Sequence, residues 1–413
     1  MTVTPQPHPV YVVGAGPGGL AVAAALRARG VRAVVLEKSD AVGASWRHHY
    51  DRLRLHTTRR LSGLPGLRMP RSFGRWPARA DVVRYLEKYA EFHDLEIVTG
   101  VEVNRIERER PGAATEETAG AVGVTGTSGA TGASVATGAA EARWVLHATG
   151  GRRLVGSAVV VATGYNHTPR LPDWPGRDAY AAKGDLVHAS AYRNPDPYEG
   201  RDVLVIGAGN TGAEIAADLA GGGAARVRLA VRTPPYIVRR STLGWPTQRS
   251  GILIRRLPVG LVDRLTGLLG RFMTADLSAH GLPRPTGGLY SRVRAGAIPV
   301  QDVGLVAAVR AGAVEPVAAV ESFEDGAVVL ADGSRITPDA VIAATGYRRA
   351  LEPLLGHLGV LDERGRPVTG RALPPGLYFT GFTNPISGMF REMALDAERI
   401  ARRIAQPAKR RTR

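Results

Sequence analysis

The chain carries nearly the same phrase twice, and this repeat constrains its fold more than any other feature. VYVVGAGPGGLAVAAAL occupies residues 10–26, and VLVIGAGNTGAEIAADL occupies residues 203–219. Each phrase begins with a short β-branched run typical of a buried strand, turns on glycines and continues with helical spacing, and another strand-like run follows it. We therefore predict two βαβ units, each about 30 residues long.

In the first phrase the pattern G-x-G-x-x-G stands directly after the strand, at Gly14, Gly16 and Gly19. Gly14 permits the tight turn and Gly16 lets the backbone approach a pyrophosphate. Gly19 lets the helix pack closely on the strand, with its N-terminal amides toward the anion. Glu37 ends the second strand, where a carboxylate accepts a hydrogen bond from a ribose hydroxyl. This first cradle (residues 14–19) suits the adenosine half of FAD.

The second phrase repeats the pattern with Gly207, Gly209 and Gly212, which form the second cradle (residues 207–212). The strand that follows, RVRLAV, leads to Arg232 where the first unit has an acid. An arginine can pair with a 2′-phosphate, whereas a carboxylate would repel it. The second cradle therefore suits NADPH; the alternative is that Arg232 is one more surface arginine in an arginine-rich chain.

The chain is strongly basic, with 54 Lys and Arg against 37 Asp and Glu and a net charge of +17. Only four of the basic residues are lysine, and together with 51 glycines this bias is typical of a GC-rich genome. The basic residues are scattered, and no stretch interleaves them with aromatic residues as a nucleic-acid-binding surface would. We therefore expect no nucleic-acid partner.

The absence of cysteine limits the chemistry further. It excludes disulfides, thiolate metal sites and a dithiol redox centre, and with the last a pyridine-nucleotide disulfide reductase. None of the ten histidines has H-E-x-x-H or similar spacing, so we expect no metal. The N-terminus has no charged start before an apolar core, and no stretch approaches the roughly 20 apolar residues of a membrane span. We expect a cytoplasmic protein without an integral membrane segment.

The order of strand-like and helical runs predicts the domain organisation. An FAD-binding domain takes residues 1–173, an NADPH-binding domain takes residues 174–328, and residues 329–413 complete the FAD-binding domain. Residues 111–142 have almost no large apolar side chains and no period, so we expect a flexible low-complexity insert between two strands. The expected fold class is α/β, with two Rossmann-like dinucleotide-binding domains and the NADPH domain inserted into the FAD domain.

Four further elements follow from periodicity and turn residues. A helix is expected over residues 82–93 and a single strand over residues 95–109. Asp332 and Gly333 predict a hairpin, because this dipeptide favours the tight turns that join antiparallel strands. Residues 376–405 predict a strand, a loop and a closing helix.

Residues 250–273 are apolar on much of their surface and are punctuated by arginines. They could form a lid over a substrate pocket, or an amphipathic stretch that touches a membrane. Pro258 and Gly260 break any single long amphipathic helix, which favours a position in the pocket or the core.

Between the two cradles, KGDLVHASAY keeps the spacing G-x-x-x-H-x-x-x-Y at Gly184, His188 and Tyr192. This resembles the signature F-x-G-x-x-x-H-x-x-x-(Y/F) of the flavin-dependent monooxygenases that carry two dinucleotide-binding domains. Ala182 replaces the leading aromatic residue of that signature. The motif continues as Tyr192-Arg193, unlike the Trp-Pro or Trp-Asp of Baeyer-Villiger enzymes, and this favours the flavin-containing monooxygenase branch.

Within that branch the chain is most similar to the plant YUCCA-type enzymes and their bacterial relatives. The similar segments are, in order, YDRLRLHT, LPVGLVDRL, PVQDVG, GLYFTGFT and SGMFREMALDAERIA. The resemblance covers nearly the whole chain outside the insert at residues 111–142. The shared order of the segments carries the resemblance more strongly than any one of them.

The resemblance implies a flavin-dependent oxygenation. NADPH would reduce FAD, the reduced flavin would add O2 to form a hydroperoxide, and one oxygen atom would pass to a small organic substrate. The reaction would be oxidative decarboxylation of an aryl-pyruvate, or oxygenation of nitrogen or sulfur. Because the flavin supplies the chemistry, such a chain needs no Ser/His/Asp set, carboxylate pair or metal cluster.

The resemblance also implies site residues. His56 and Thr57 would lie near the isoalloxazine ring, where a histidine or hydroxyl donor could replace the Asn of many relatives; alternatively, His56 is a packed structural histidine. His188 is expected to shape the domain junction. The implied cofactor-binding residues are Gly14, Gly16, Pro17, Gly18, Gly19, Glu37, Lys38, Trp46, Val103, Thr163, Gly164, Gly207, Gly209, Asn210, Thr211, Gly212, Arg232, Thr345, Gly346 and Gly381.

Two other functions stay open on the sequence alone. A ferredoxin-type reductase also pairs FAD with NADPH, and a basic surface could dock an acidic iron-sulfur partner. A non-catalytic flavoprotein could sense the ratio of NADPH to NADP. The expected partners are otherwise a small-molecule substrate and O2, and a homodimer is left open.

Overall fold

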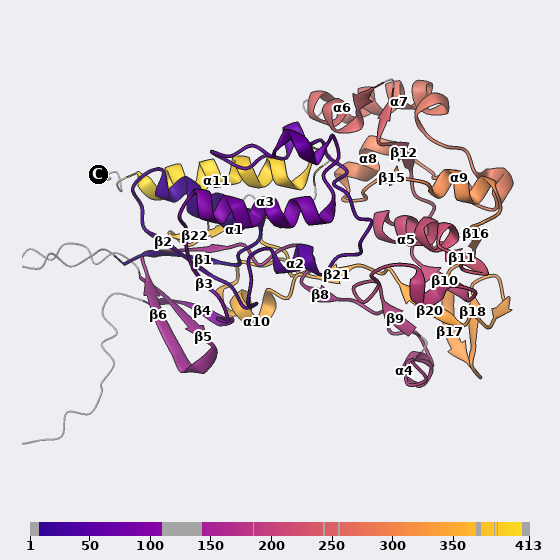
Figure 1. Ribbon diagram of the computed structural model, residues 1–413, viewed down its shortest axis with the longest axis horizontal. Coiled ribbons are helices and arrows are strands. Elements are labelled where there is room, and N and C mark those ends of the chain that lie inside the picture. The colour runs from indigo at the N-terminus through magenta and orange to yellow at the C-terminus, as the bar shows by residue number, and fades with distance from the viewer. Residues whose placement is uncertain are drawn as a thin grey trace, which may run out of the picture.

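The computed structural model describes residues 8–109, 143–184, 186–242, 244–254, 257–368, 373–383, 385 and 387–406. These residues form two α/β lobes that lie side by side, each built on a parallel sheet (Figure 1). The expected fold class, with two Rossmann-like domains in one chain, is confirmed. The predicted insert at residues 111–142 lies outside the described residues.

The first lobe is built on a sheet in which every pair of neighbouring strands is parallel. Because side chains alternate along a strand, Val10 and Val12 face one layer, and Tyr11 and Val13 face the other. In order across the sheet, the strands are β22 (Leu377–Phe379), β7 (Ala158–Val161), β1 (Val10–Val13), β2 (Ala33–Leu36) and β3 (Glu96–Val98).

Different layers cover the two faces of this sheet (Figure 1). Helices cover one face, namely α1 (Pro17–Arg27), α3 (Arg79–Phe92) and α11 (Met389–Ala405). An antiparallel meander and a short helix cover the other, namely β4 (Val103–Glu109), β5 (Arg143–Ala148), β6 (Arg152–Gly156) and α10 (Glu352–Leu355). Glu109 pairs with Arg143, so the residues that flank the expected insert in sequence are neighbours in β4 and β5.

The second lobe repeats this plan. Its strands are also parallel, in the order β16 (Glu315–Val317), β11 (Arg226–Ala230), β10 (Asp202–Ile206), β20 (Ala340–Ala343) and β9 (Leu186–His188). Helices α5 (Asn210–Gly221) and α9 (Leu305–Arg310) pack on one face. The antiparallel strands β17 (Val320–Glu324), β18 (Ala327–Leu330) and β19 (Arg335–Ile336) pack on the other.

The chain passes between the lobes at a two-stranded ribbon, where β8 (Thr168–Pro169) pairs antiparallel with β21 (Tyr347–Arg348). After β21 the chain returns to the first sheet through β22, and α11 packs against α1. The second lobe is therefore inserted into the first, as expected.

The predicted end of the second domain, residue 328, is wrong. Strand β20 pairs with β10 and β9 inside the second sheet, so the second lobe continues to at least Ala343. The error has a structural origin, because β20 and β7 are equivalent strands of the two lobes. Each lies beside the strand that carries a cradle, and each is followed by Ala-Thr-Gly.

Several predicted elements are confirmed with changed limits. The helix expected over residues 82–93 begins three residues earlier, as α3. The single strand expected over residues 95–109 is two strands, β3 and β4, because the chain turns at Gly100, which has a φ of 68°. The hairpin at Asp332 and Gly333 joins β18 to antiparallel β19, and β22 and α11 form the predicted closing segment.

Residues 250–273 form parts of two helices, α6 (Thr247–Ile254) and α7 (Val259–Met273), which are separated beside Pro258 as predicted. Gly260 lies within α7 and does not break it, contrary to the prediction. The expected pocket or core position holds only in part. Val262 is buried, but the side chains of Leu253, Leu257 and Leu261 are 67%, 43% and 49% exposed.

The remaining elements connect or flank the two sheets. They are α2 (Ala44–Arg47), α4 (Arg177–Ala181), α8 (Leu289–Arg294), β12 (Ile237–Arg239), β13 (Ser241–Thr242), β14 (Trp245–Pro246), β15 (Val300–Asp302), and short 3-10 turns at Arg59–Leu61, Arg71–Phe73, Thr149–Gly151, Asp196–Tyr198, Ser278–His280 and Gly356–Leu358.

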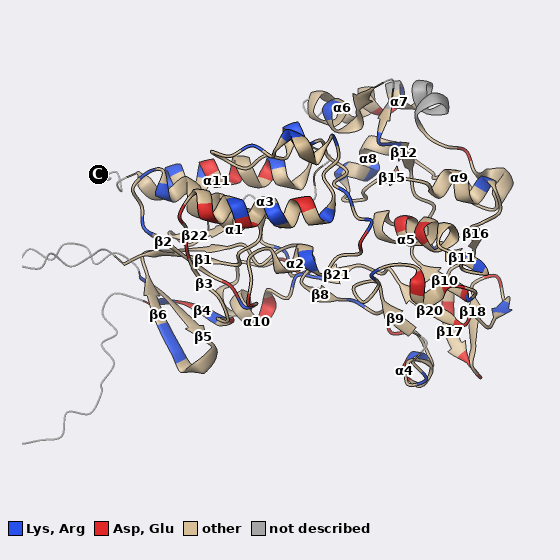
Figure 2. Cartoon of the chain, viewed as in Figure 1, with Lys and Arg blue, Asp and Glu red and all other residues tan. Residues whose placement is uncertain are grey.

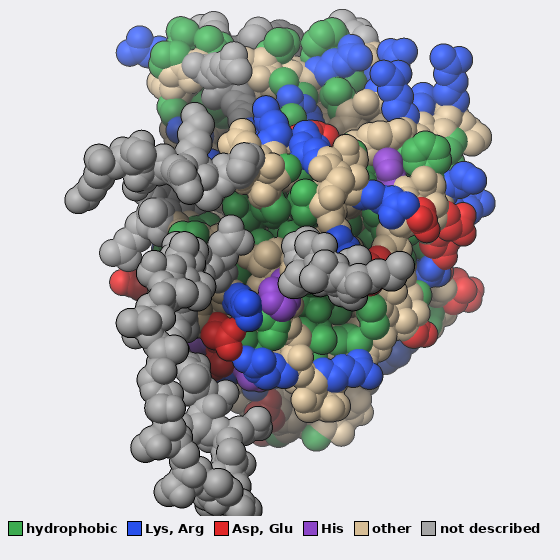
Figure 3. Space-filling model, turned by 90° about the vertical axis from the view of Figure 1, so that its left-hand side faces the viewer, with side chains coloured by type: hydrophobic (Ala, Val, Ile, Leu, Met, Phe, Trp, Pro, Cys, Tyr) green, Lys and Arg blue, Asp and Glu red, His purple; other side chains and the backbone are tan. Residues whose placement is uncertain are grey.

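Charged residues are spread over both lobes (Figure 2). On the face shown in Figure 3, basic groups alternate with acidic and apolar ones and form no continuous basic band. In the described ranges, no helix has both the length and the apolar character needed to cross a membrane.

Candidate functional site

The first cradle is shaped by close backbone contacts. Gly14 has a φ of 110°, and its amide donates to the carbonyl oxygen of Leu36 at 2.7 Å. A Cβ at Gly19 would lie 1.9 Å from the carbonyl oxygen of Gly14, so α1 can approach β1 only with glycine there. A Cβ at Gly16 would meet nothing within 4 Å. The turn is therefore tight on its inner side and open at Gly16.

The second cradle has almost the same geometry. Gly207 has a φ of 107°, and its amide donates to the carbonyl oxygen of Ala230 at 3.0 Å. A Cβ at Gly212 would lie 1.9 Å from the carbonyl oxygen of Gly207, and a Cβ at Gly209 would meet nothing within 4 Å. The repeat in the sequence is thus a repeat in three dimensions.

Both cradles fit a dinucleotide phosphate. Gly16 and Gly209 are the N-caps of α1 and α5, and neither helix has a side-chain cap on its first amides. Uncapped amides at a helix N-terminus favour an anion. Beside the first cradle, the hydroxyl oxygens of Thr163 and Thr380 are buried without a hydrogen-bond partner in the described chain, as expected of groups that contact a cofactor.

Glu37 braces the first cradle. It is only 8% exposed, and its two carboxylate oxygens accept hydrogen bonds from the amides of Ala15 (2.7 Å) and Ser39 (3.0 Å). Each carboxylate oxygen has two acceptor positions, so these bonds leave room for a ribose hydroxyl. Glu37 directly follows Leu36, whose carbonyl holds the first glycine.

The equivalent position in the second lobe is Val231, because it directly follows Ala230, whose carbonyl holds Gly207. Arg232 lies one residue further along and is equivalent to Lys38. The prediction that Arg232 takes the place of the acid is therefore wrong by one residue. The charge argument is unaffected, since an apolar valine replaces the carboxylate that would repel a phosphate.

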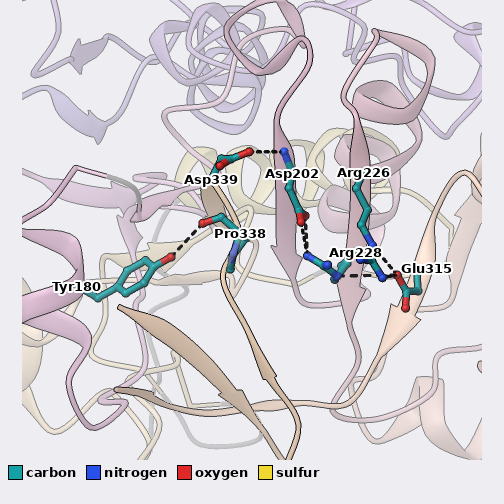
Figure 4. A network of polar contacts seen from close by, with 7 residues as sticks. All are labelled: Tyr180, Asp202, Arg226, Arg228, Glu315, Pro338 and Asp339. Carbon is teal, nitrogen blue, oxygen red and sulfur yellow. Dashed lines mark hydrogen bonds and ion pairs between the residues drawn. The ribbon is translucent and has the colours of Figure 1, made fainter. Parts of the chain in front are cut away.

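A cavity of about 860 Å³ lies along β11, β16 and the β18–β19 hairpin. Figure 4 shows that two of its arginines are engaged by acids on neighbouring strands. Arg228 donates to both carboxylate oxygens of Asp202, at 2.6 and 2.7 Å, and Arg226 donates to Glu315 at 2.6 and 3.0 Å. These pairs neutralise one part of the cavity wall.

Two further arginines line the same cavity. Arg335 pairs with Glu324 at 2.9 Å. Arg232 is exposed, and it makes no hydrogen bond or ion pair within the described part of the chain. The free guanidinium at the carboxyl end of β11 is therefore available to an anion beside the second cradle.

Residues 50–56 connect the first lobe to the second. The amide of Asp51 donates to the carbonyl oxygen of Arg193 at 2.8 Å, and Arg52 pairs with Asp218 of α5 at 3.2 Å. These contacts hold the segment against the second lobe, which includes α5, the helix that begins at the second cradle.

The central contact of this junction is Glu214 of α5, which is only 2% exposed. One carboxylate oxygen accepts a hydrogen bond from the hydroxyl of Tyr50 at 3.0 Å, and the other lies 2.9 Å from Nε2 of His56. Burial, and then the neighbouring Glu214 carboxylate, raise the pKa of Tyr50 well above its ordinary value. Tyr50 is therefore held as a protonated donor.

The next residues, Thr57 and Thr58, contact the start of α11. A Cβ at Gly388 would lie 2.6 Å from the Thr57 methyl group and 2.8 Å from Nε2 of Gln248. Gln248 of α6 accepts from the Thr58 amide at 2.9 Å and donates to the carbonyl oxygen of Ser387 at 2.7 Å. Three segments that are distant in sequence thus converge at the predicted site of His56 and Thr57.

An arginine without a polar partner lies at the same junction. The guanidinium of Arg240 stacks over the ring of Trp76, with 4.8 Å between guanidinium carbon and ring centre. Its Nε is buried, and among the described residues its guanidinium has no hydrogen-bond partner. Burial lowers the pKa of Arg240, and the charge of Glu214 opposes this effect. A partly buried cation whose guanidinium has no hydrogen-bond partner favours an anionic ligand.

His188 has a structural position. Its Nδ1 accepts from the Ser190 amide at 3.0 Å, so Nε2 carries the proton and donates to the carbonyl oxygen of Gly346 at 3.0 Å. Burial lowers the pKa of His188, which keeps the ring neutral. These contacts place His188 where the chain leaves the second sheet, in agreement with the predicted role at the domain junction.

The other residues expected near the first cradle come from several elements of the first lobe. Lys38 contacts Nε2 of His167 at 3.2 Å. Trp46 packs edge-on against Phe390 in the first turn of α11, and Val103 is the first residue of β4. Pro17 and Gly18 are the first residues of α1. Gly164 and Gly381 have positive φ angles of 93° and 82°, which glycine adopts readily.

Near the second cradle, some expected cofactor residues have structural partners. Asn210 accepts from the Gln301 amide at 2.8 Å, which ties α5 to β15. The Thr345 hydroxyl donates to the carbonyl oxygen of Arg170 in the crossing ribbon. Thr211 lies in the first turn of α5.

Glu214, Gln248 and Arg240 were not predicted from the sequence. Glu214 had a detectable signal, because it is a charged residue within a run of small and apolar residues that faces the core. Gln248 and Arg240 had none, since their neighbours come from distant segments. No group of three or more His, Cys, Asp or Glu side chains is placed to hold a metal ion in the described residues.

Comparison with known proteins agrees with this geometry. The family described as flavin-binding monooxygenase-like matches residues 145–358, and the family described as pyridine nucleotide-disulphide oxidoreductase matches residues 11–132. The second match covers the first cradle. It brings no dithiol chemistry, since the chain has no cysteine.

Similar proteins cover most of the chain. The indole-3-pyruvate monooxygenase YUCCA1 of Oryza sativa subsp. japonica is 35% identical over 90% of this chain and 86% of its own length. The indole-3-pyruvate monooxygenase YUCCA6 of Arabidopsis thaliana is 34% identical over 95% and 89%. The solved structure of a flavin-containing monooxygenase from Stenotrophomonas maltophilia matches with a TM-score of 0.68 and 25% identity, over 97% of this chain and 98% of that one.

Proposed function

The chain belongs to the flavin-binding monooxygenase-like family, and on that premise we propose that it is an NADPH- and O2-dependent FAD monooxygenase that acts on an aryl-pyruvate. The observation that carries the proposal is the pair of matching cradles with different charge beside them. A carboxylate, Glu37, braces the first cradle. The second has Val231 in the equivalent place and an unpaired arginine, Arg232, next to it.

The residues of the first lobe fit the flavin. The open side of Gly16 and the uncapped amides of α1 would hold the pyrophosphate, Glu37 the ribose, and the buried hydroxyls of Thr163 and Thr380 would contact the cofactor. When bound, the flavin accepts a hydride from NADPH and activates O2. The chain itself supplies binding, orientation and exclusion of water.

The residues of the second lobe fit the hydride donor. Gly209 and the uncapped amides of α5 would hold its pyrophosphate, and Arg232 its 2′-phosphate. Residues 50–56 join α5 to the first lobe, so the hydride donor would be bound on an element that contacts the loop of His56 and Thr57. These two residues would orient groups beside the isoalloxazine ring.

Arg240 favours an anionic substrate over a neutral amine or thioether. Its partly buried guanidinium has no hydrogen-bond partner or ion pair in the described chain and stacks on Trp76, so a substrate carboxylate could pair with it and an aromatic group could pack nearby. This agrees with the indole-3-pyruvate named for its relatives. The reaction would consume aryl-pyruvate, O2, NADPH and a proton, and would yield the aryl-acetate, CO2, water and NADP⁺.

Purified protein tests the proposal directly. It should retain FAD, oxidise NADPH in air and convert phenylpyruvate or indole-3-pyruvate to the corresponding acetate. If the protein oxygenates a thioether or an amine and leaves aryl-pyruvates unchanged, the proposed reaction would be heteroatom oxygenation instead of decarboxylation. Protein that cannot be loaded with FAD, or that leaves NADPH unoxidised in air, would contradict it.

A further inference from the structure

We propose that Glu214 is a positioning residue that sets the place of the NADPH-binding helix against the loop beside the flavin. The inference rests on the proposed function, because it concerns the hydride step of that reaction. Glu214 belongs to neither cradle and is not required to touch a cofactor. Among the described residues of α5, Glu214 contacts both Tyr50 and His56.

The contacts of Glu214 join one residue of the second lobe to two residues of the first. The carboxylate comes from the second lobe, and both of its partners come from residues 50–56 of the first. Oε2 accepts a hydrogen bond from the Tyr50 hydroxyl at 3.0 Å, and Oε1 lies 2.9 Å from Nε2 of His56 as a close ionic contact without hydrogen-bond geometry. The hydrogen bond and the close contact together place two residues of segment 50–56 against one side chain of α5.

The position of Glu214 along α5 links it to the second cradle. The helix begins at Asn210, directly after the N-cap Gly209, so Glu214 lies about one turn from the amides that would hold the pyrophosphate. A helix of this kind moves as a rigid unit over so short a distance. A shift of the nucleotide-binding amides would therefore shift the carboxylate and its two partners.

The other end of the linkage is the flavin loop. His56 is followed by Thr57, whose methyl group packs against Gly388 at the N-cap of α11. Gln248 fixes the next residue, Thr58, to Ser387. A continuous series of contacts therefore runs from the second cradle through Glu214 and His56 to the segment that the proposed function places beside the isoalloxazine ring.

The energetics favour a positioning role over a purely stabilising one. Burying a carboxylate carries a desolvation cost, and buried polar clusters are often no more stable than apolar side chains of the same volume. What such a cluster supplies is a defined geometry. Hydride transfer needs that geometry, because reacting atoms must approach within about 3–3.5 Å and a misplacement of about 1 Å can lower the rate about 100-fold.

The test measures anaerobic flavin reduction by NADPH in stopped-flow, in FAD-loaded wild type and in Glu214→Gln, which keeps the size of the side chain but removes its charge. The limiting rate of reduction should fall at least tenfold, while the NADPH concentration for half-maximal rate stays within threefold and FAD content is unchanged. A merely structural residue would instead lower FAD content or thermal stability and leave the limiting rate of the loaded protein as it was.

Asp218→Asn is the matched control. Asp218 lies on α5 one turn after Glu214 and accepts from Tyr192 and Arg52, but it has no contact with His56. Its limiting rate should stay within threefold of wild type. An equal loss in Asp218→Asn and Glu214→Gln would overturn the specific role of Glu214.

A double-mutant cycle completes the test. His56→Gln should slow reduction by a similar factor, and the double variant His56→Gln/Glu214→Gln should be no slower than the slower single variant, because both changes remove one linkage. If Glu214→Gln fails to retain FAD, His56→Gln alone carries the same prediction. Multiplied effects in the double variant, or single-variant rates within twofold of wild type, would overturn the inference. Wild type that NADPH does not reduce would instead contradict the proposed function.

Discussion

Glu37 and Val231 occupy the same place in the two βαβ units. Each directly follows the residue whose carbonyl oxygen accepts the amide of the first cradle glycine, Leu36 in one lobe and Ala230 in the other. The backbone around them is nearly the same, and their side chains differ in charge. The chain thus contains the same βαβ unit twice, and the residue after the second strand distinguishes which ligand each unit suits.

The first prediction concerns the 2′-phosphate. Arg232→Ala should raise the KM for NADPH by about 10- to 100-fold, the range expected when a charge-assisted pair of about 1.5–3 kcal/mol is lost. The KM for NADH should change by less than twofold, since NADH has no 2′-phosphate. Steady-state oxidation of both cofactors checks this. An equal rise for NADH and NADPH would remove the proposed contact.

The second prediction separates the cradles. Gly19→Ala should abolish retention of FAD, because its Cβ would lie 1.9 Å from the carbonyl oxygen of Gly14. Gly212→Ala creates the same clash in the second lobe and should leave FAD bound but prevent its reduction by NADPH. Gly221→Ala, at the end of α5 where a Cβ would meet nothing within 4 Å, is the control and should behave as wild type. Loss of FAD in Gly212→Ala would contradict the division of ligands.

The third prediction concerns the substrate. Arg240→Gln should raise the KM for an aryl-pyruvate by about 10-fold or more, because it removes a charge-assisted contact with the carboxylate. A neutral thioether, if it is turned over, should keep its KM within twofold. The unchanged rate of flavin reduction by NADPH shows that the cofactor sites are intact. A KM for aryl-pyruvate that does not change would exclude Arg240 from substrate binding.

The fourth prediction is a pH dependence of stability. Burial, then the charges of Arg193 and Arg79, lower the pKa of His49 from 6.5 to about 4. In the unfolded chain His49 takes up a proton as the pH falls through 6.5, whereas in the folded chain it does so only near pH 4. The stability contributed by neutral His49 is therefore complete above pH 6.5 and is lost progressively toward pH 4.

The measurement compares wild type with His49→Gln by denaturant unfolding at pH 7 and pH 4.5. Between these values the wild type should lose about 2 kcal/mol more than the variant, since one pKa unit corresponds to about 1.4 kcal/mol. The variant serves as the reference for carboxylates that titrate in the same range. If the free energies of unfolding of wild type and variant change in parallel between pH 7 and pH 4.5, the pKa of His49 is not lowered in the folded protein.

The local features of the fold were predictable from sequence because their causes are local. The glycines of both cradles, the helices that follow them and the hairpin at Asp332 and Gly333 each depend on conformations that a few neighbouring residues determine. The break of the strand at Gly100 was missed, since strand-like residues continue on both sides of it.

The domain boundary at residue 328 failed for a different reason. Strand β20 and strand β7 have similar sequences, and the pattern does not state which sheet each joins. The repeat itself would have assigned β20 to the second sheet, because an Ala-Thr-Gly segment follows the strand beside each cradle. A Cβ at Gly14 would touch the carbonyl of Ala162, and one at Gly207 would touch that of Ala344.

The junction could not be predicted from sequence. Tyr50 and Glu214 are 164 residues apart, and their hydrogen bond depends on how the two lobes pack. The same holds for Gln248, which joins Thr58 to Ser387. Sequence patterns identify the surfaces that are buried, but the partners across a domain interface follow from tertiary packing.

Oxygen labelling tests the central claim, a division of labour between a flavin cradle and a hydride-donor cradle in one monooxygenase. FAD-loaded protein is given NADPH, an aryl-pyruvate and ¹⁸O-labelled O2, and the products are measured by mass spectrometry against NADPH consumed. One aryl-acetate is expected per NADPH, with one labelled oxygen in its carboxylate. NADPH oxidation that leaves every candidate substrate unlabelled, with electrons passed to O2 to form hydrogen peroxide or passed to added ferredoxin, would contradict it.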